Sequence, residues 1–545
     1  MRNILVGIAL TTLVFGGLTF VACGGDDSEF KEGDGDGGPN SGLDGQCLQF
    51  GGCGPTDARG NPNPDAPAGC AGLNCNIATC NAGQSTTITG KVYDPAGKVP
   101  LYNVVVYIQD PAKPLDEIKP GLGEQCDRCS GTATGVLTRA DEKKTQVYTQ
   151  TDATGSFKLE NVPSGVEKLT LVMQIGKWRR KVDIAPPQSC QTLNLTDVNV
   201  TRLPKNHTEG DLPRIALTTG GADPMECLLK KMGLDVAEFG ISSDAEKRVH
   251  LFKGGSTGAR IATSSFQAGG NFPAATDLWN TFDKLKAYDL VIMSCEGSDT
   301  EGNQLSKPVS ARQAMNEYSL RGGKIFSTHY HHFWWSNSPE PKVKGLATWT
   351  SDYTCGDKTG ETGGTCTNGC PGSTSINSPT TPVTDTCSTV ADPPPSPAVK
   401  ASINTTFEKG KSMKEWLGNT NSLNQDGTLD ILEMRHNVEL KAPPNENLIS
   451  WMTVQNPAAG GRTAHEYISF NTPVGAGANE VCGRVVYSDL HVVPSSQTNG
   501  DKTNSPFPTG CNTDELTGQQ KALEFMLFDL SSCVRRDIDP PTGPR

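Results

Sequence analysis

Two stretches, YDLVIMSC at residues 288–295 and GGKIFSTH at residues 322–329, decide the fold of the larger part of this chain. Each contains a short apolar run without helical spacing, which predicts a strand buried on both faces of a sheet. Residues 309–320 between them have the spacing of a helix, and Gly322-Gly323 ends it. Strands that alternate with helices predict a parallel sheet covered on both faces.

The same alternation extends over residues 211–535, which we expect to form one α/β domain. Asp223 and Pro224 are placed to cap and begin a helix that follows the first strand. The remaining expected strands are 214–219, 248–252, 448–454, 466–470 and 484–490, and the remaining expected helices are 274–286, 412–417 and 517–530.

Ligands bind to parallel sheets at the carboxyl ends of the strands, which here are residues 294–297 and 329–335. The second place holds three of the eight histidines in the chain. If the strand continued, His329 and His331 would share a face and could bind a divalent metal ion. The alternatives are aromatic packing in the core or a flat carbohydrate-binding surface, for which the candidate ligand-binding residues are Tyr330, His331, Trp334 and Trp335.

Three blocks of this half, 288–291, 322–329 and 482–491, resemble the ThuA-like members of the glutamine-amidotransferase-like group. The resemblance implies a flavodoxin-like α/β fold and places His329 and His491 at two histidine positions of that family. Leu490 replaces the glycine that precedes the second histidine in the family. Proteins of this family are linked to sugar metabolism, so the resemblance implies a pocket and, as one alternative, an enzyme acting on a sugar or amide.

Cys295 is a candidate nucleophile because it follows a buried strand, as the reactive cysteine of amidotransferases does. The sequence lacks the first glycine of the usual Gly-x-Cys-x-Gly turn, since Met293 stands there. A disulfide or a buried free thiol are the alternatives. No complete catalytic motif and no H-E-x-x-H sequence occurs in the chain.

Residues 422–433 imitate a calcium-binding loop, with glycine at the sixth position. Ser422 replaces the usual first aspartate, so a polar turn before a strand at 429–435 is the preferred interpretation. The candidate calcium ligands are Asn424, Asp426, Asp430 and Glu433.

Residues 84–203 contain several short strands separated by Gly and Pro turns, which predicts an all-β sandwich of the immunoglobulin-like or transthyretin-like kind. ITGKVYD at 88–94 and TDATGSF at 151–157 resemble the carboxypeptidase regulatory-like domain. That family is an accessory module of surface proteins and is not itself a peptidase.

The first 22 residues have a basic start and an apolar run, as a secretory signal peptide does. Small residues before Cys23 resemble a bacterial lipobox, which implies that Cys23 carries the lipid anchor. Gly24 in place of Asp implies sorting to the outer membrane or cell surface, although the periplasmic face is also compatible. Residues 23–46 are Gly, Asp and Ser, which predicts a disordered tether.

The chain has 18 cysteines, and export favours disulfides. We expect them to order a Cys-rich neck at 47–83 and a Cys-rich insertion at 351–400, with Cys295 unpaired. The pair Cys126 and Cys129 has the spacing of half a zinc site, which is the alternative there. The Pro-rich tail, 536–545, is expected to be loose.

A net charge of −12 and no basic run argue against nucleic acid as a partner. The first expectation for function is an exported, lipid-anchored envelope protein that binds a carbohydrate or another envelope ligand, such as an envelope protein, through its α/β domain. The alternatives are a ThuA-like enzyme and a structural envelope protein with a degenerate pocket. No cofactor is indicated firmly, and a divalent metal is one option.

Overall fold

A computed structural model describes residues 70, 72–123, 126–129, 136–137, 147–220, 223–254, 271–296, 307–349, 398–492 and 506–539. All of them belong to one compact unit, Cys53–Arg545. The signal peptide, Cys23, the tether, most of the neck and the insertion at 351–397 lie outside the described residues. Among the described residues, no helix is long and apolar enough to cross a membrane.

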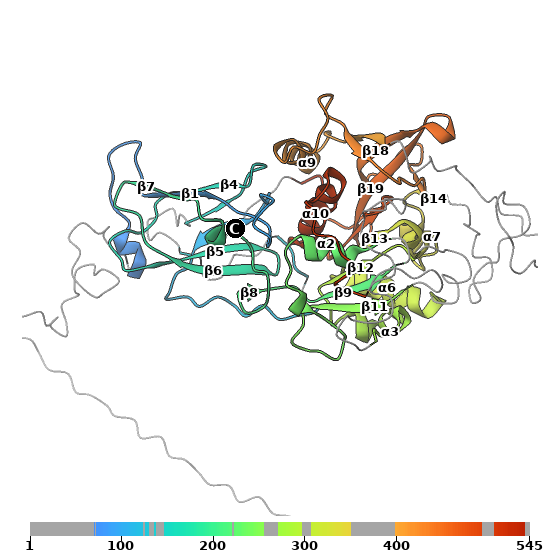
Figure 1. Ribbon diagram of the computed structural model, residues 1–545, viewed down its shortest axis with the longest axis horizontal. Coiled ribbons are helices and arrows are strands. Elements are labelled where there is room, and N and C mark those ends of the chain that lie inside the picture. The colour runs from blue at the N-terminus through green and yellow to red at the C-terminus, as the bar shows by residue number, and fades with distance from the viewer. Residues whose placement is uncertain are drawn as a thin grey trace, which may run out of the picture. The chain divides into compact units, whose positions relative to one another are not determined.

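The N-terminal part is a β-sandwich of two sheets, as the sequence predicts (Figure 1). One sheet has the order β4-β1-β7 and the other β3-β2-β5-β6-β8. Their bounds, with those of two short helices, are η1 Gly72–Asn76, β1 Thr87–Lys91, β2 Val105–Ile108, β3 Tyr148–Gln150, β4 Ser156–Leu159, β5 Leu169–Ile175, β6 Trp178–Ile184, β7 Thr192–Leu195, α1 Val198–Thr201 and β8 Gly210–Asp211.

The C-terminal part is built on a ten-stranded sheet with the order β10-β11-β9-β12-β13-β20-β19-β18-β15-β16. The first half of the chain in this part forms β9 Ile215–Thr219, α2 Met225–Lys231, η2 Val236–Glu238, β10 Phe239–Gly240, β11 Val249–Lys253, α3 Ala275–Trp279, α4 Phe282–Leu285, β12 Leu290–Met293, α6 Val309–Leu320, β13 Lys324–Thr328, η3 His329–His332, α7 Phe333–Ser336, α8 Pro341–Lys344 and β14 Thr348–Trp349. The second half forms β15 Val399–Ile403, α9 Glu408–Asn419, β16 Leu429–Ile431, β17 Val438–Glu439, β18 Ile449–Asn456, η4 Pro457–Ala459, β19 Arg462–Thr472, β20 Gly483–Ser488 and α10 Gly518–Ser531.

This sheet is mixed, which corrects the expectation of a purely parallel one. Six neighbouring strands, β10, β11, β9, β12, β13 and β20, pair in parallel. Beyond β20, the strands β19, β18, β15 and β16 extend the sheet by antiparallel pairing. The four added strands arise where the sequence shows a long region without the strand–helix alternation. Antiparallel neighbours need no crossover helix, so this region could not be placed by that rule.

Helices cover both faces of the parallel strands, as predicted. Leu217 and Ile292 pack in one apolar cluster with residues of α2, α9 and α10, whereas Ala216 and Val291 pack in another with residues of α3, α4 and α6. Neighbouring residues of one strand therefore face opposite sides, which is the alternation that a strand imposes. Figure 1 shows the labelled helices around these strands.

The sandwich and the α/β part share the first of these clusters and are joined covalently. The rings of Tyr102 and Phe525 stack, and the Trp416 indole donates to the Pro100 carbonyl at 2.6 Å. Two disulfides, Cys126–Cys482 and Cys129–Cys533, fasten a sandwich loop to the sheet domain. These bonds rule out the zinc alternative for that cysteine pair.

The other described disulfides are Cys70–Cys75, Cys80–Cys190 and Cys227–Cys511. They confirm that the described cysteines of the neck are cross-linked. Cys295 is free, as predicted. Five disulfides are typical of an oxidising compartment outside the cytoplasm.

The start of the C-terminal tail is not loose, which corrects the sequence expectation. Asp537 is buried and pairs with Arg484 at 2.6 Å and with Lys409 at 3.0 Å. Asp529 on α10 joins the same pair of cations. A buried charge has to be compensated, so these contacts hold the chain as far as Asp539 against the sheet domain.

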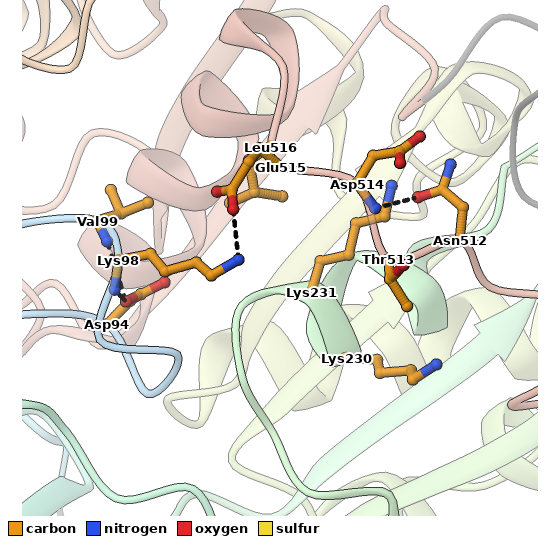
Figure 2. Close-up of a pocket in the computed structure, with 10 residues that line it drawn as sticks. All are labelled: Asp94, Lys98, Val99, Lys230, Lys231, Asn512, Thr513, Asp514, Glu515 and Leu516. Carbon is orange, nitrogen blue, oxygen red and sulfur yellow. Dashed lines mark hydrogen bonds and ion pairs between the residues drawn. The ribbon is translucent and has the colours of Figure 1, made fainter. Parts of the chain in front are cut away.

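A pair of buried carboxyl groups lies where the sandwich meets α10. Asp94 lines a pocket of about 170 Å³ together with Lys230 and residues 512–516 (Figure 2). Its Oδ1 accepts from the backbone N–H groups of Lys98 at 2.7 Å and Val99 at 3.1 Å. Burial raises the pKa of Asp94 from 3.8 to about 6, and hydrogen bonds from Lys98 and Val99 offset part of that rise. Burial, and then the charge of Asp94, raise the pKa of Glu524 on α10 well above its usual value.

Because the folded pKa of Asp94 exceeds its ordinary value, the folded state binds the proton more tightly than the unfolded chain. The stabilisation is present below about pH 4 and is lost as the pH rises through about 6. The variant Asp94→Asn keeps the acceptor for both N–H groups and removes the charge. We expect the wild type to lose up to about 3 kcal/mol relative to this variant between pH 4 and 7. Unfolding midpoints measured across that range test this, with exposed Asp283→Asn as the control; parallel curves for Asp94→Asn and wild type would contradict it.

Candidate functional site

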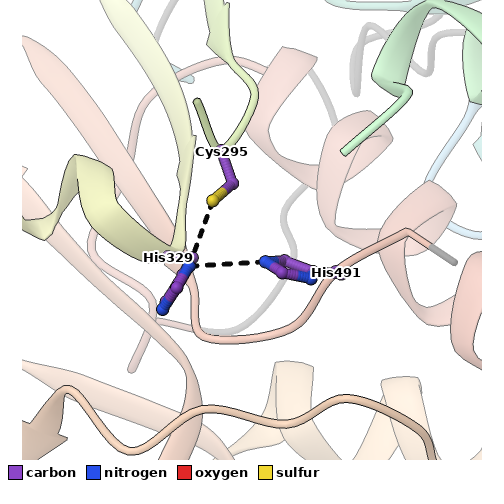
Figure 3. A group of neighbouring side chains, drawn as sticks. All are labelled: Cys295, His329 and His491. Carbon is purple, nitrogen blue, oxygen red and sulfur yellow. Dashed lines mark hydrogen bonds between the residues drawn. The ribbon is translucent and has the colours of Figure 1, made fainter. Parts of the chain in front are cut away.

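Cys295, His329 and His491 come together at the carboxyl edge of the parallel strands (Figure 3). They follow β12, β13 and β20, which are adjacent in the sheet. Met293 pairs with Ser327, and Thr328 pairs with Ser488, so the three strands end at nearly the same level. The chain turns off each strand there, and the three side chains lie at a common edge beside the point where the strand order reverses, between β9 and β12.

The three side chains are in direct contact. Cys295 Sγ lies 3.0 Å from His329 Nδ1, and His491 Nε2 lies 3.4 Å from the same nitrogen. One ligand atom from each of the three residues lies within 4.8 Å of the other two. Their exposed fractions are 0%, 4% and 2%, so the protein removes all three from bulk water.

Glu433 completes the group from the antiparallel half of the sheet. Its Oε2 lies 3.1 Å from His491 Nδ1, and it is buried. Met434 forms an antiparallel bridge with Leu490, which brings the two segments side by side. The Gln519 side chain at the start of α10 donates to the carbonyls of Leu432 and His491, which fixes both backbones.

The four candidate calcium ligands in residues 422–433 do not face a common point, so the calcium alternative is wrong. Glu433 binds His491 instead of facing the loop. Asp426 pairs with Lys400 at 2.6 Å, and Asn424 turns its amide nitrogen to Asp430 at 2.8 Å. The residues make the polar turn before β16 that the sequence offers as the preferred interpretation.

Asp223 is a member of the site that the sequence interpretation assigned to a helix cap. The helix α2 begins at Met225 without a side-chain cap, and the carboxyl of Asp223 instead accepts from the Val492 N–H at 2.6 Å. Burial raises its pKa, and the neighbouring His491, Thr328 and Cys295 backbone lower it. The strand-end rule, applied to β9, would have included this residue.

The backbone around the site is closely fitted. His329 has φ of +42°, a left-handed conformation that is uncommon for residues other than glycine. The Tyr487 hydroxyl lies 2.9 Å from the His329 carbonyl, and Thr328 Oγ1 accepts from the Cys295 N–H at 2.8 Å. A Cβ at Gly220, after β9, would lie 1.9 Å from the Cys295 carbonyl oxygen, so only glycine fits there.

The two histidines carry different charges. Burial, and then the charge of His491, lower the pKa of His329 well below its usual value, so its ring is neutral. Burial alone would lower the pKa of His491, but contacts with Cys295, Glu433 and Asp223 raise it to about 10. The group therefore joins a neutral imidazole and a positively charged one to Cys295, with carboxyl groups behind them.

The aromatic segment after His329 packs in the core, which is one of the alternatives that the sequence left open, and it does not form an exposed carbohydrate-binding surface. The chain does not continue as a strand but turns into η3 and α7. Trp334 and Trp335 are 2% and 3% exposed, and Tyr330 is half-buried. His331 bonds to the Ser294 carbonyl at 2.8 Å and accepts from the Trp334 indole at 3.1 Å, so both ring nitrogens are used. His331 therefore cannot join His329 at a metal.

Such a group has two chemical uses. A thiol beside an imidazole that a carboxylate orients is the arrangement of a cysteine nucleophile. One sulfur and two ring nitrogens around a common point are also three ligands for a transition metal. In both cases Glu433 orients His491, and the reacting position lies among Cys295, His329 and His491.

Replacement of Trp334 separates core packing from ligand binding. Its ring lies edge-on to Trp279 with the centroids 5.2 Å apart. We expect Trp334→Ala to lower the free energy of unfolding by about 3–5 kcal/mol, because it removes a buried indole. Denaturant unfolding measures this, and half-buried Tyr330→Ala should cost much less. A Trp334→Ala protein as stable as the wild type would contradict the assignment of Trp334 to the core.

Neither a protein-family model nor a curated protein matches this chain. Among solved structures, a putative ThuA-like protein from Bacteroides uniformis is 11% identical, with a TM-score of 0.28, over 60% of this chain and 96% of that one. A type II cohesin–X-dockerin complex from Acetivibrio cellulolyticus is 14% identical, with a TM-score of 0.13, over 29% of this chain and 77% of that one. Both TM-scores are too low to support an argument from these structures. We therefore assign the fold from the sheet topology, which is a β-sandwich followed by a mixed, largely parallel α/β sheet.

Proposed function

We propose that the α/β part of this protein is an enzyme that acts on a sugar or an amide outside the cytoplasm. One observation carries this proposal: a thiol and two imidazoles from three strands meet at the carboxyl edge of the sheet. Cys295 and His329 are 34 residues apart in the sequence, and His329 and His491 are 162 apart. Convergence of groups from several strand ends is what a reacting centre requires.

The burial of charge around this centre supports the proposal. Asp223, Glu433, Glu466 and Asp489 are all nearly inaccessible to solvent. Each buried carboxyl group costs free energy unless partners compensate it, and a hydrophobic core would avoid that cost. Burial raises the pKa of Asp223, and shifts of this kind are common at reacting sites.

The sugar-binding alternative loses its main support because the tryptophans lie in the core. The choice of sugar or amide as substrate class comes from the resemblance of 288–291, 322–329 and 482–491 to ThuA-like proteins. Roles follow from position: Cys295 and His329 contact the substrate or the group that activates it, and Glu433 positions His491.

The proposed location is the outer membrane or cell surface, with the lipid anchor on Cys23. The five disulfides support an oxidising compartment. The resemblance of residues 84–203 to carboxypeptidase regulatory-like domains supports a role for the sandwich as an accessory module, and its contacts with α10 support a role in holding the sheet domain.

A turnover assay tests the reacting centre. Full-length exported protein is incubated with a panel of nitrophenyl glycosides and with carboxamides, with release of nitrophenol or ammonia as the readout. We expect one of the two classes to be turned over, and Cys295→Ala and His491→Asn each to lower kcat/KM by at least about 100-fold, because each removes a reacting group.

The matched control is His250→Asn, since His250 is buried in β11 of the same sheet and bonds to Tyr288 and the Asp244 carbonyl, away from the centre. Near-ultraviolet circular dichroism checks that each variant is folded. Wild-type protein without turnover on either class, or folded Cys295→Ala with the wild-type rate, would refute the proposal.

Fractionation of cells tests the anchor. In the wild type we expect a labelled fatty acid on the protein and recovery with outer membranes. Cys23→Ala removes the acceptor thiol, so the label should be lost and the protein should leave the membrane fraction. Gly24→Asp should keep the label and shift the protein to inner membranes. Label that persists in Cys23→Ala would show that another residue is modified.

A further inference from the structure

We infer that Cys295 Sγ, His329 Nδ1 and His491 Nε2 bind one zinc-type divalent metal ion, with Glu433 hydrogen-bonded behind His491. This inference deepens the proposed function, since it uses the same centre and assigns Cys295 as a ligand instead of a nucleophile. Among the described residues, these three are the group whose atoms are placed to hold a metal.

The distance between the two histidines fits a shared metal. Two imidazole nitrogens bound to one tetrahedral zinc ion at about 2.05 Å lie about 3.3–3.4 Å apart. His329 Nδ1 and His491 Nε2 are 3.4 Å apart. That separation is long for a hydrogen bond between ring nitrogens, whose ordinary length is about 2.9–3.0 Å.

The thiol needs only a small displacement. A sulfur at about 2.3 Å from the same zinc ion would lie about 3.5 Å from each nitrogen. Cys295 Sγ is now 3.0 Å from His329 Nδ1. The sulfur would thus move outward by about half an ångström, which a rotation about one side-chain bond supplies.

The outer contacts match those of metal-bound histidines. A histidine ligand commonly gives its second ring nitrogen to a carboxylate, which fixes the ring and its tautomer. His491 has this arrangement, with Nδ1 on Glu433 at 3.1 Å and Nε2 facing His329. The metal would displace the proton on Nε2 to solvent and leave the proton on Nδ1 bonded to Glu433. The Gln519 side chain donates to the carbonyls of Leu432 and His491, so the backbones that carry Glu433 and His491 are held in place before a metal arrives.

The ligand set selects the kind of metal. One thiolate and two imidazoles suit zinc and related transition ions, whereas calcium and magnesium prefer oxygen ligands. Three protein ligands leave one tetrahedral position open to water or to a substrate oxygen, as in catalytic zinc sites. Asp223 lies next to this group, with its carboxyl near Thr328 and the Cys295 backbone.

The state of Cys295 is a second, independent observation. Ten described cysteines form disulfides, and Cys295 alone among the described ones does not. A thiolate bound to a metal and shielded from solvent is protected from oxidation in the compartment that forms those disulfides. A free sulfur at this buried position is what a metal ligand requires.

Metal analysis of full-length exported protein tests the inference. We expect about one zinc per chain after dialysis, and loss of the metal on prolonged treatment with a chelator. Cobalt added to the stripped protein should give the visible absorption of a tetrahedral site and a sulfur-to-cobalt charge-transfer band. Cys295→Ala should lack that band, and His491→Asn should not retain stoichiometric metal.

The variant Glu433→Gln separates positioning from folding. It keeps the size of the side chain and all three ligands, so the stoichiometry and the charge-transfer band should remain while the zinc affinity falls by about 10- to 100-fold. The control His250→Asn should bind zinc like the wild type. Folded wild-type protein that binds no stoichiometric zinc or cobalt, or Cys295→Ala that binds zinc as tightly as the wild type, would overturn the inference.

The two proposals fail in different ways. Stripped protein that keeps full turnover would refute the metal and leave a cysteine-based enzyme in place. Stoichiometric metal bound through Cys295 in a protein that turns over neither class of substrate would confirm the metal site and refute the proposed function.

Discussion

The parallel pairing of β12, β13 and β20 is the constraint on which the site depends. Hydrogen bonds between these strands set Met293 against Ser327 and Thr328 against Ser488. The residues that follow these strands therefore lie at the same position along the strand direction, to within about one residue. Because a shift of one residue turns a strand's side chains to the other face, both apolar clusters around the sheet enforce this register. The core therefore holds the three reacting side chains together.

The antiparallel strands add what the parallel part alone lacks. Glu433 reaches His491 only because the segment after β16 returns beside Leu490. Gln519, at the start of α10, bonds to both segments, so the closing helix connects the two halves of the sheet at the site. The same helix carries Phe525 and Phe528, which pack against Tyr102 and Trp178 of the sandwich. A single helix thus links the sandwich, the sheet and the position of His491.

Sequence rules located Cys295 and His329 because strand ends can be read from apolar runs, whereas His491 was singled out only by the family resemblance of residues 482–491. They failed at residues whose place depends on contacts distant in the sequence. Glu433 fitted a local calcium pattern, but its partner lies 58 residues further on. Asp223 satisfied the rule for a helix cap, yet its carboxyl binds Val492. The segment 329–335 has the composition of a binding surface, and nothing local shows that the chain turns at His329 with φ of +42° and carries the tryptophans inward.

Cys295 is buried and free, whereas the other described cysteines form disulfides. An oxidising compartment converts accessible cysteines to disulfides, yet Cys295 remains free beside His329, which in turn contacts the charged His491. Burial alone would protect a structural cysteine, and an apolar neighbourhood would be enough for that. Two histidines and buried carboxyl groups make the neighbourhood polar at a cost in stability. The polar groups around this sulfur therefore argue for chemistry at Cys295, as a nucleophile or as a metal ligand, and against a passive role in the core.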